Sequence, residues 1–353
     1  MIALKNTCCF TIMIALIILF TVFTGACISP AQPASPGTPV PELTTVKVAY
    51  MPIISFGPLF IAQEEGYFAR QGINVEFEKF LSTSAALPAL INGDIAVSGG
   101  TLFPGLINAI SEGAHIRIVA DKGIIRPDSC TSQAFLLRRD LVESGAITTV
   151  SDLRGKKVAA GTDQSYGVFR ALALGNLTTS DIEFVDMPRS GILVAFENGA
   201  IDAAFLMEPY LTEAVRSNNS VVFLKDYDFT PNSSNPLLYG TAFTDTDPGL
   251  GGRFMVAYLE GVRQYNQGKT ERNLQILSKY TQLDREVLNE TCWVPVAETG
   301  EFPPEPVHEY VDWMYTNKKI TRIVENDQLI DMSYVQYANG VLSNSTRNSS
   351  PVL

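Results

Sequence analysis

Residues that commonly carry enzyme chemistry are scarce in this sequence. Its 353 residues include only two histidines, His115 and His308, and five cysteines. The cysteines are Cys8, Cys9, Cys27, Cys130 and Cys292. None of their spacings resembles a zinc site, and no Cys/His/Asp cluster is visible. A Ser-His-Asp arrangement would have to recruit one of the two histidines. This scarcity argues against a metal- or thiol-based enzyme, and we expect no cofactor.

Basic residues are also few, and they are not clustered. The chain has 26 Lys and Arg against 37 Asp and Glu, which gives a net charge of −11. No basic stretch offers a track for phosphates, so nucleic acid is excluded as a partner. Hydrophobic residues make up 46% of the chain, and its length gives room for two ordinary domains.

The N-terminus resembles a targeting signal. Lys5 is followed by an uncharged run from Asn6 to Ala26, and small residues precede Cys27. The pattern predicts a lipoprotein signal peptide over residues 1–27 with the lipid on Cys27, although Thr24 stands where a Leu is usual. An uncleaved membrane anchor and plain secretion remain alternatives, because about 20 apolar residues can span a bilayer. All of these place the rest of the chain outside the cytoplasm.

Two further segments have compositions that cannot build a core. Residues 28–45 contain five prolines among Ser, Ala, Gly and Thr, which predicts an extended tether between the membrane and a folded domain. Residues 343–353 are rich in Ser and Asn, and we expect a disordered tail there.

One supersecondary pattern occurs twice. From Ser84 the chain predicts a Ser-capped helix that ends at Asn92-Gly93, followed by a short buried strand over residues 95–97. The same order of helix end, Asn198-Gly199, Asp and apolar strand returns about a hundred residues later. A repeat at this distance predicts two similarly built α/β lobes with a ligand site between them. Alternating strand and helix patterns in both halves favour mostly parallel sheets flanked by helices.

Several motifs, taken in order, carry a family resemblance. They are Val46-Lys47-Val48-Ala49-Tyr50, Pro58-Leu59-Phe60-Ile61-Ala62-Gln63-Glu64-Glu65-Gly66-Tyr67-Phe68, Gly72-Ile73-Asn74-Val75-Glu76, Asn92-Gly93-Asp94-Ile95-Ala96, Leu153-Arg154-Gly155-Lys156-Lys157-Val158-Ala159 and Glu208-Pro209-Tyr210. The set resembles the ABC-transporter substrate-binding proteins of the nitrate/sulfonate/taurine and thiamine-pyrimidine-precursor class. The resemblance implies a two-lobed periplasmic-binding-protein type II fold with two crossover connectors. Lobe 1 would comprise residues 46–126 and 236–342, and lobe 2 residues 130–232.

In such proteins the ligand contacts loops after strands and helix starts that face the cleft. The ligand-binding candidates carried over are Phe56, Ser84, Ser98, Gly99, Thr101, Gly161, Thr162, Ser165, Tyr166 and Glu208. Helix N-termini at these places would suit a sulfonate, nitrate or carboxylate. For the single residues other roles remain open, because Ser84 and Thr101 could cap helices and Phe56 and Tyr166 could belong to the core.

The charges near these loops leave the ligand open. Asp163 and Glu208 would favour an amine, whereas Lys122 and Arg126, near the first connector, could supply the opposite pole. A zwitterion such as an aminosulfonate would satisfy both.

The function expected from the resemblance is capture of a small anionic or zwitterionic solute by hinge closure. The protein, expected to be a monomer, would deliver this solute to the permease of an ABC importer. Alternatives are a binding protein for a thiamine pyrimidine precursor, a pyrimidine-biosynthesis-type enzyme, or a tethered ligand sensor on the same fold. A disulfide between Cys130 and Cys292 is possible outside the cell but is not favoured, since Cys130 lies in a connector that should move, and the pairing stays open.

Overall fold

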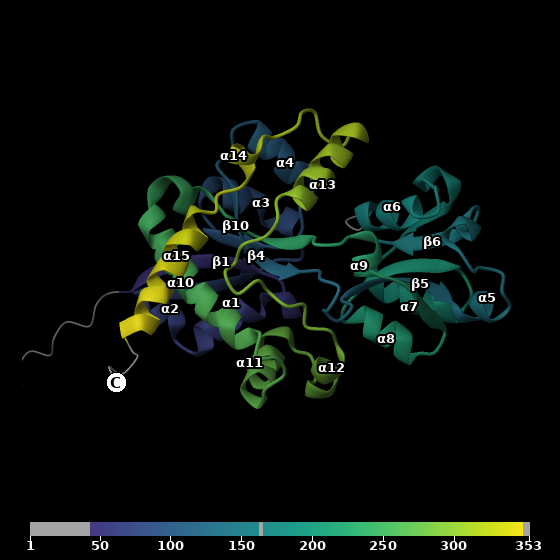
Figure 1. Cartoon of the computed structure of the whole chain (residues 1–353), viewed down its shortest axis with the longest axis horizontal. Coiled ribbons are helices and arrows are strands. Elements are labelled where there is room, and N and C mark those ends of the chain that lie inside the picture. Colours follow the sequence, from purple (N-terminus) through teal and green to yellow (C-terminus); the bar gives the residue numbers. More distant parts are fainter. Residues whose placement is uncertain (1–42, 162–164, 349–353) are drawn as a thin grey trace, which may run out of the picture. The chain divides into compact units, whose positions relative to one another are not determined.

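The chain folds into two α/β lobes, each built on a mixed five-stranded sheet (Figure 1). The computed structural model describes residues 43–161 and 165–348. The fold class expected from the sequence is thereby confirmed, with one antiparallel strand in each otherwise parallel sheet.

The first lobe uses both ends of the described chain. Its N-terminal part contains β1 (Thr44–Tyr50), η1 (Ile54–Phe56), α1 (Gly57–Glu64), α2 (Tyr67–Arg70), β2 (Ile73–Lys79), α3 (Thr83–Asn92), β3 (Val97–Gly99), α4 (Pro104–Ser111) and β4 (Arg117–Ile124). Its C-terminal part contains β10 (Ser234–Tyr239), η5 (Ala242–Thr246), α10 (Pro248–Tyr265), α11 (Glu271–Thr281), α12 (Arg285–Glu290), α13 (Glu305–Thr316), α14 (Asn326–Leu329) and α15 (Ser333–Asn348).

The second lobe is a single stretch of chain between these two parts. It contains β5 (Gln133–Arg138), α5 (Arg139–Glu143), η2 (Val150–Leu153), β6 (Lys157–Ala160), α6 (Ser165–Ala173), η4 (Thr179–Asp181), β7 (Glu183–Asp186), α7 (Arg189–Glu197), β8 (Ala203–Met207), α8 (Tyr210–Arg216), β9 (Ser220–Lys225) and α9 (Asp226–Phe229).

The two sheets have the same strand order. The first runs β2-β1-β3-β10-β4, and the second runs β7-β6-β8-β5-β9. In each sheet the antiparallel strand, β10 or β5, is the first strand after the chain crosses from the other lobe. This shared topology is the structural basis of the repeat in the sequence.

The repeated Asn-Gly pair ends a helix in both lobes. Gly93 follows α3 with φ 79°, and Gly199 follows α7 with φ 65°, a left-handed conformation that glycine adopts without a Cβ clash. The strand after the first pair lies later than expected, at Val97–Gly99. The backbone of Ala96 is already fixed to the sheet, because its N–H donates to the carbonyl of Lys47 at 3.0 Å.

Helices cover both faces of each sheet (Figure 1). In the first lobe, one face packs against α1, α10, α11 and α15 through residues such as Val48, Phe60 and Phe254. The other face packs against α3, α4 and α13. In the second lobe, α6 covers one face, and α7 and α8 cover the other. Each lobe therefore has its own buried apolar core on both sides of its sheet.

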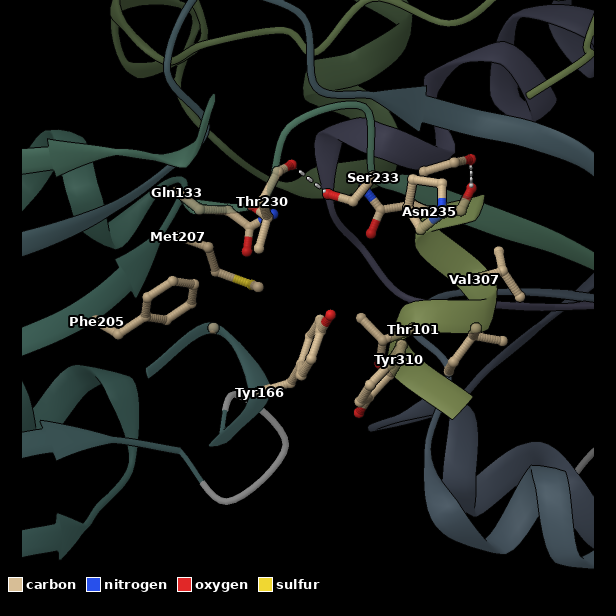
Figure 2. Close-up of a pocket in the computed structure, with 14 residues that line it drawn as sticks. Thr101, Gln133, Tyr166, Phe205, Met207, Thr230, Ser233, Asn235, Val307 and Tyr310 are labelled. Atoms are coloured by element: carbon tan, nitrogen blue, oxygen red, sulfur yellow. Dashed lines mark hydrogen bonds between the residues drawn. The ribbon is translucent and has the colours of Figure 1, made fainter. Parts of the chain in front are cut away.

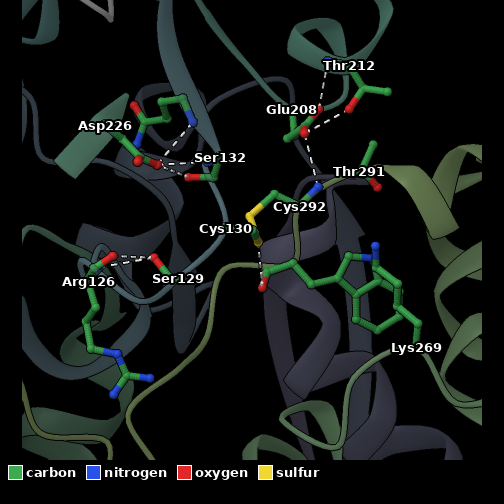
Figure 3. The surroundings of a disulfide bond; sticks show 12 residues. Arg126, Ser129, Cys130, Ser132, Glu208, Thr212, Asp226, Lys269, Thr291 and Cys292 are labelled. Atoms are coloured by element: carbon green, nitrogen blue, oxygen red, sulfur yellow. Dashed lines mark hydrogen bonds between the residues drawn. A yellow bond between two sulfur atoms is a disulfide. The ribbon is translucent and has the colours of Figure 1, made fainter. Parts of the chain in front are cut away.

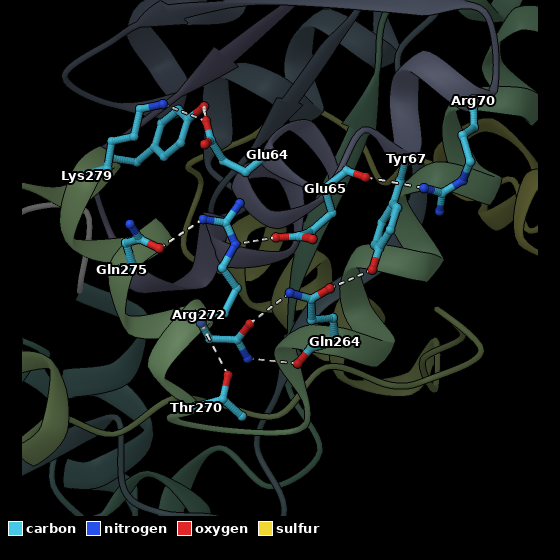
Figure 4. A network of polar contacts seen from close by, with 11 residues as sticks. Glu64, Glu65, Tyr67, Arg70, Gln264, Thr270, Arg272, Gln275 and Lys279 are labelled. Atoms are coloured by element: carbon cyan, nitrogen blue, oxygen red, sulfur yellow. Dashed lines mark hydrogen bonds and ion pairs between the residues drawn. The ribbon is translucent and has the colours of Figure 1, made fainter.

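A network of polar side chains joins the early and late helices of the first lobe (Figure 4). Lys279 of α11 lies 2.7 Å from Glu64, Arg272 lies 2.6 Å from Glu65, and the Tyr67 hydroxyl donates to Gln264 at 2.5 Å. These contacts hold α1 and α2 against α10 and α11, which the sequence places about 200 residues later.

One expected boundary agrees with the structure and one differs. β4 ends at Ile124, within the expected first part of lobe 1, and the Asp121 carboxylate accepts hydrogen bonds from Gly123 N, Ala297 N and the Ser234 hydroxyl. The tail was expected to be disordered from residue 343, yet α15 continues to Asn348. Leu342 is buried in the core of the first lobe and anchors this helix.

The segment preceding the first lobe is mostly outside the described residues. The signal peptide and Cys27 lie there, and so does most of the expected tether, whose final residues 44 and 45 belong to β1. Within residues 43–161 and 165–348, no helix combines the length and the apolar character that crossing a membrane would require.

Candidate functional site

A pocket lies between the two lobes where the connectors meet them (Figure 2). Its volume is about 120 Å³, several times the roughly 15 Å³ that a single water needs. Its lining consists of Thr101, Leu102, Gln133, Tyr166, Gly167, Phe205, Met207, Thr230, Ser233, Ser234, Asn235, Pro306, Val307 and Tyr310. The space is therefore suited to a small molecule.

The topology of the sheets brings these residues together. Thr101 follows the carboxyl end of β3, and Phe205 and Met207 lie at the carboxyl end of β8. Because β10 and β5 run antiparallel to their neighbours, their amino ends, Ser234 and Gln133, reach the same edges. Open α/β sheets bind ligands at this edge, so the pocket stands where the fold favours a site.

Aromatic residues from α6 and α13 close one side of the pocket. The rings of Tyr166 and Tyr310 stack across the lobes with centroids 4.2 Å apart. The Trp313 ring also packs here, with its centroid 5.1 Å from that of Tyr166 and 5.4 Å from that of Phe169. Burial raises the pKa of the Tyr166 hydroxyl, so it stays protonated at neutral pH. The two lobes thus touch directly beside the pocket.

The opposite side of the pocket is a polar wall formed by Thr230, Ser233, Ser234 and Asn235, which we call the connector wall (Figure 2). Behind it lies Asp121, whose side chain is fully buried. The Ser234 hydroxyl donates to Asp121 Oδ1 at 2.5 Å. Burial raises the pKa of Asp121, and the hydrogen bonds to its carboxylate oppose that effect.

The structure brings two of the ten candidate residues into the pocket lining, Thr101 and Tyr166. Gly161 directly follows β6, and Ser165 begins α6, so both lie on the same side of the second sheet as Tyr166. Thr162 lies outside the described residues, and so does Asp163.

Three candidates of the first lobe are buried beneath its loops. Phe56 has no exposed surface and belongs to the core, and Ser98 and Gly99 lie within β3. A Cβ at Gly99 would stand 2.7 Å from the Lys122 side chain, so a glycine there leaves room for the lysine.

Ser84 is an exposed residue of the first turn of α3. The expected capping role belongs instead to Ser82, whose hydroxyl accepts from Ala85 N at 3.2 Å. Ser84 lies next to this cap, with its hydroxyl 2.8 Å from that of Ser82.

Glu208 lies apart from the pocket lining, next to the connector and α12 (Figure 3). Its carboxylate accepts from the Thr212 hydroxyl at 2.9 Å and from Cys292 N at 3.0 Å. Burial raises the pKa of Glu208, and these hydrogen bonds oppose the rise. The side chain therefore ties the β8–α8 turn of the second lobe to a segment of the first.

Cys130 and Cys292, whose pairing the sequence left open and did not favour, form a disulfide (Figure 3). The residues are 162 positions apart in sequence, and their Cα atoms lie 5.6 Å apart. The connector does not separate the two cysteines, because Cys292 does not belong to a distant rigid body. It lies in the segment after α12, which is itself packed against the connector side of the molecule, as the Glu208 contact shows.

Lys122 and Arg126, which the sequence offered as positive groups for the ligand, do not line the pocket. Lys122 is buried in the first lobe, where its Nζ donates to the Ser55 hydroxyl at 2.7 Å and lies 4.5 Å from the Phe56 ring centroid. Burial lowers its pKa to about 7. Arg126 lies 3.9 Å from Asp128 on the first connector.

Most of the pocket lining was not among the candidates. Residues 233–235 of the connector wall lie between the expected end of lobe 2 and the expected return to lobe 1, so that signal was available. Tyr310 has no comparable local signal, because only packing against the first sheet places α13 beside the second lobe. In the described ranges, no group of three or more His, Cys, Asp or Glu residues is arranged to hold a metal ion.

Comparison with known proteins gives three consistent results. Residues 40–232 match the model of the NMT1-like family. The bicarbonate-binding protein CmpA of Synechococcus elongatus is 27% identical over 198 residues, which are 51% of this chain and 44% of that protein. The match with this chain thus spans less than half the length of CmpA. A putative aliphatic sulfonates-binding protein of Bacillus subtilis is 21% identical, and the match covers 80% of this chain and 85% of that protein.

Among solved structures, the periplasmic aliphatic sulphonate binding protein SsuA of Escherichia coli matches with a TM-score of 0.67. The structural match covers 83% of this chain and 92% of SsuA, and the sequence identity is 20%. This similarity shows that the two proteins share a fold.

Proposed function

The chain belongs to the NMT1-like family, and on that premise we propose that it is an extracytoplasmic solute-binding protein that serves an ABC importer. The observation that carries the proposal is the pocket, whose lining comes from both lobes and from the return connector. A ligand seated there contacts both lobes only when they are closed. Its binding energy therefore favours the closed form, which the permease can recognise.

The N-terminal segment gives the proposed protein its location. The apolar run before Cys27 would direct export, and a lipid on Cys27 would hold the protein on the outer face of the membrane. The proline-rich segment 28–45 would keep the lobes within reach of the permease.

We propose binding without chemistry. The two described cysteines are joined to each other, and His115 pairs with Asp245 at the surface, 2.7 Å away and apart from the pocket lining. The side chains that line the pocket are hydroxyls, amides, aromatic rings and apolar groups. These groups are suited to binding a small solute without converting it.

Small-angle X-ray scattering of the full chain, with and without candidate solutes, tests the proposal. The solutes are taurine, alkanesulfonates, nitrate, bicarbonate and aminopyrimidines. A solute that binds should reduce the radius of gyration and be recovered unchanged after denaturation. Conversion of the solute would indicate an enzyme, and binding with no change in radius would contradict hinge closure.

A further inference from the structure

The hydroxyl groups of the connector wall all donate their protons to acceptors of the protein itself. The Ser233 hydroxyl donates to the Thr230 carbonyl at 2.8 Å (Figure 2). The Ser234 hydroxyl donates to Asp121 Oδ1 at 2.5 Å, and the Thr230 hydroxyl donates to the Asp226 carbonyl at 2.9 Å. All three residues also line the pocket.

A hydroxyl group has one proton and two lone pairs. Since the protons of all three hydroxyls are used inside the protein, what these groups can offer a ligand is lone pairs. Asn235 adds to this surface, because its amide nitrogen donates to the Gly123 carbonyl at 3.4 Å and its side-chain oxygen receives no hydrogen bond from the described residues. The connector wall is thus a surface of hydrogen-bond acceptors.

Two buried carboxylates lie behind this surface. Asp121 holds the Ser234 hydroxyl, and Asp226 accepts from Ser132 N at 2.8 Å and from Gln133 N at 3.2 Å. Basic groups lie near the wall as well, because Lys122 interacts electrostatically with Asp121 and Arg170 Nε donates to the Phe229 carbonyl at 3.0 Å. The preference of the wall for a ligand therefore rests on its lone pairs, which accept hydrogen bonds from a donor group.

The rest of the pocket is suited to an apolar body. Tyr166, Tyr310, Phe205 and Met207 lie across from the connector wall or beside it (Figure 2). Aromatic rings and a thioether pack well against alkyl groups and flat rings. Thr101 and Gln133, at the margins, can still donate or accept.

We propose that the ligand of this pocket carries an N–H donor group, as an ammonium or a ring amino group, on a small apolar or aromatic body, with the donors seated against the connector wall. The inference rests on the proposed solute-binding function and narrows its ligand class. A nitrate, sulfonate or carboxylate oxygen placed at the wall would face lone pairs and would receive no hydrogen bond from these hydroxyls. An acidic group on the same ligand would have to lie at the margins of the pocket.

Two matched pairs of probes test this class on the full chain by isothermal titration calorimetry. The pairs are taurine with ethanesulfonate, and 4-aminopyrimidine with pyrimidine; in each pair only the first member has an amino group. Sites built to hydrogen-bond a group reject analogues that lack it. In at least one pair, the amino-bearing probe should therefore bind at least tenfold more tightly than its partner. Nitrate and bicarbonate serve as anion controls.

The chain provides a matched control for the connector wall. Ser233 and Ser129 each donate from the hydroxyl to the carbonyl three residues earlier, at 2.8 Å and 2.7 Å, but only Ser233 lines the pocket. Ser233→Ala should weaken binding of the amino-bearing probe about three- to tenfold. Ser129→Ala, which loses the same local hydrogen bond and also the one that Ser129 Oγ accepts from Arg126 N, should leave the affinity for this probe unchanged.

The outcomes separate the inference from the proposed function. If ethanesulfonate, nitrate or bicarbonate binds as tightly as the amino-bearing probes, or if Ser233→Ala has no effect, the ligand class is overturned and solute binding stands. If none of the six compounds binds, the result counts against both.

Discussion

Arg170 of α6 and Glu309 of α13 form an ion pair between the lobes, with Nη1 and Oε2 2.8 Å apart. The same two helices carry the stacked rings of Tyr166 and Tyr310. The protein's own contacts therefore join the two lobes on the side of the pocket that faces the connector wall.

The variant Glu309→Gln should weaken solute binding, because closure of the lobes becomes less favourable without the ion pair. An ion pair at this exposure stabilises by about 0.2–1 kcal/mol, so the apparent dissociation constant should rise by up to about fivefold. Calorimetry at low and high salt measures the effect, which should shrink as salt increases. Asp312→Asn, on the same helix, is the control. Equal effects of the two variants would show that the ion pair has no role in closure.

The disulfide should contribute strongly to stability. Closing a loop of 162 residues restricts the unfolded chain, and native disulfides typically contribute about 2–4 kcal/mol. Urea unfolding of the Cys130→Ser/Cys292→Ser variant should give a free energy of unfolding lower by this amount. Adding a reductant to the wild-type protein should produce the same loss, and a midpoint that does not move in either experiment would contradict the pairing.

Lys122 should make stability depend on pH. Burial lowers its pKa from 10.5 to about 7, so between pH 7 and pH 10 the unfolded chain holds a proton that the folded chain has released. The free energy of unfolding therefore rises with pH across this window. The rise should be on the order of 2–4 kcal/mol.

Lys122→Met should remove this rise. The comparison is made by urea unfolding at pH 6, 7, 8 and 9, because the difference between the two proteins isolates the contribution of this one group. Lys318→Met, an exposed lysine, is the control and should keep the wild-type slope. Parallel curves for the wild type and Lys122→Met would mean that Lys122 is not buried as described.

Glu208→Gln should affect stability rather than binding. The carboxylate bonds Thr212 and Cys292 N outside the pocket lining, so weakening these bonds should lower the free energy of unfolding by about 1–3 kcal/mol. Calorimetry with the best probe should show an unchanged dissociation constant once the protein is folded. If the fully folded variant instead binds the probe more than tenfold more weakly, Glu208 is a ligand-binding residue, as the sequence alone predicted.

The sequence predicts the lobes better than it predicts the site. Alternating apolar segments and the two Asn-Gly pairs are local signals, and they lead to the two sheets and their flanking helices. Glu208 follows a strand at the expected edge, but its side chain is held by Thr212 and by a backbone N–H that lies 84 residues later. The pairing of Cys130 with Cys292 and the stacking of Tyr310 on Tyr166 likewise depend on tertiary packing, which no local pattern records.

The account depends most directly on whether the interlobe pocket is where a solute binds. Met207 lines the pocket from β8, and Met207→Trp would fill part of its volume of about 120 Å³. The decisive measurement is the thermal unfolding midpoint of the full wild-type chain and of this variant against the panel of solutes. The account predicts that a solute at 1,000 times its dissociation constant stabilises the wild type by about 4 kcal/mol. The same solute should leave the midpoint of Met207→Trp unchanged. A solute that stabilises both proteins equally would contradict the account, since it would bind somewhere else.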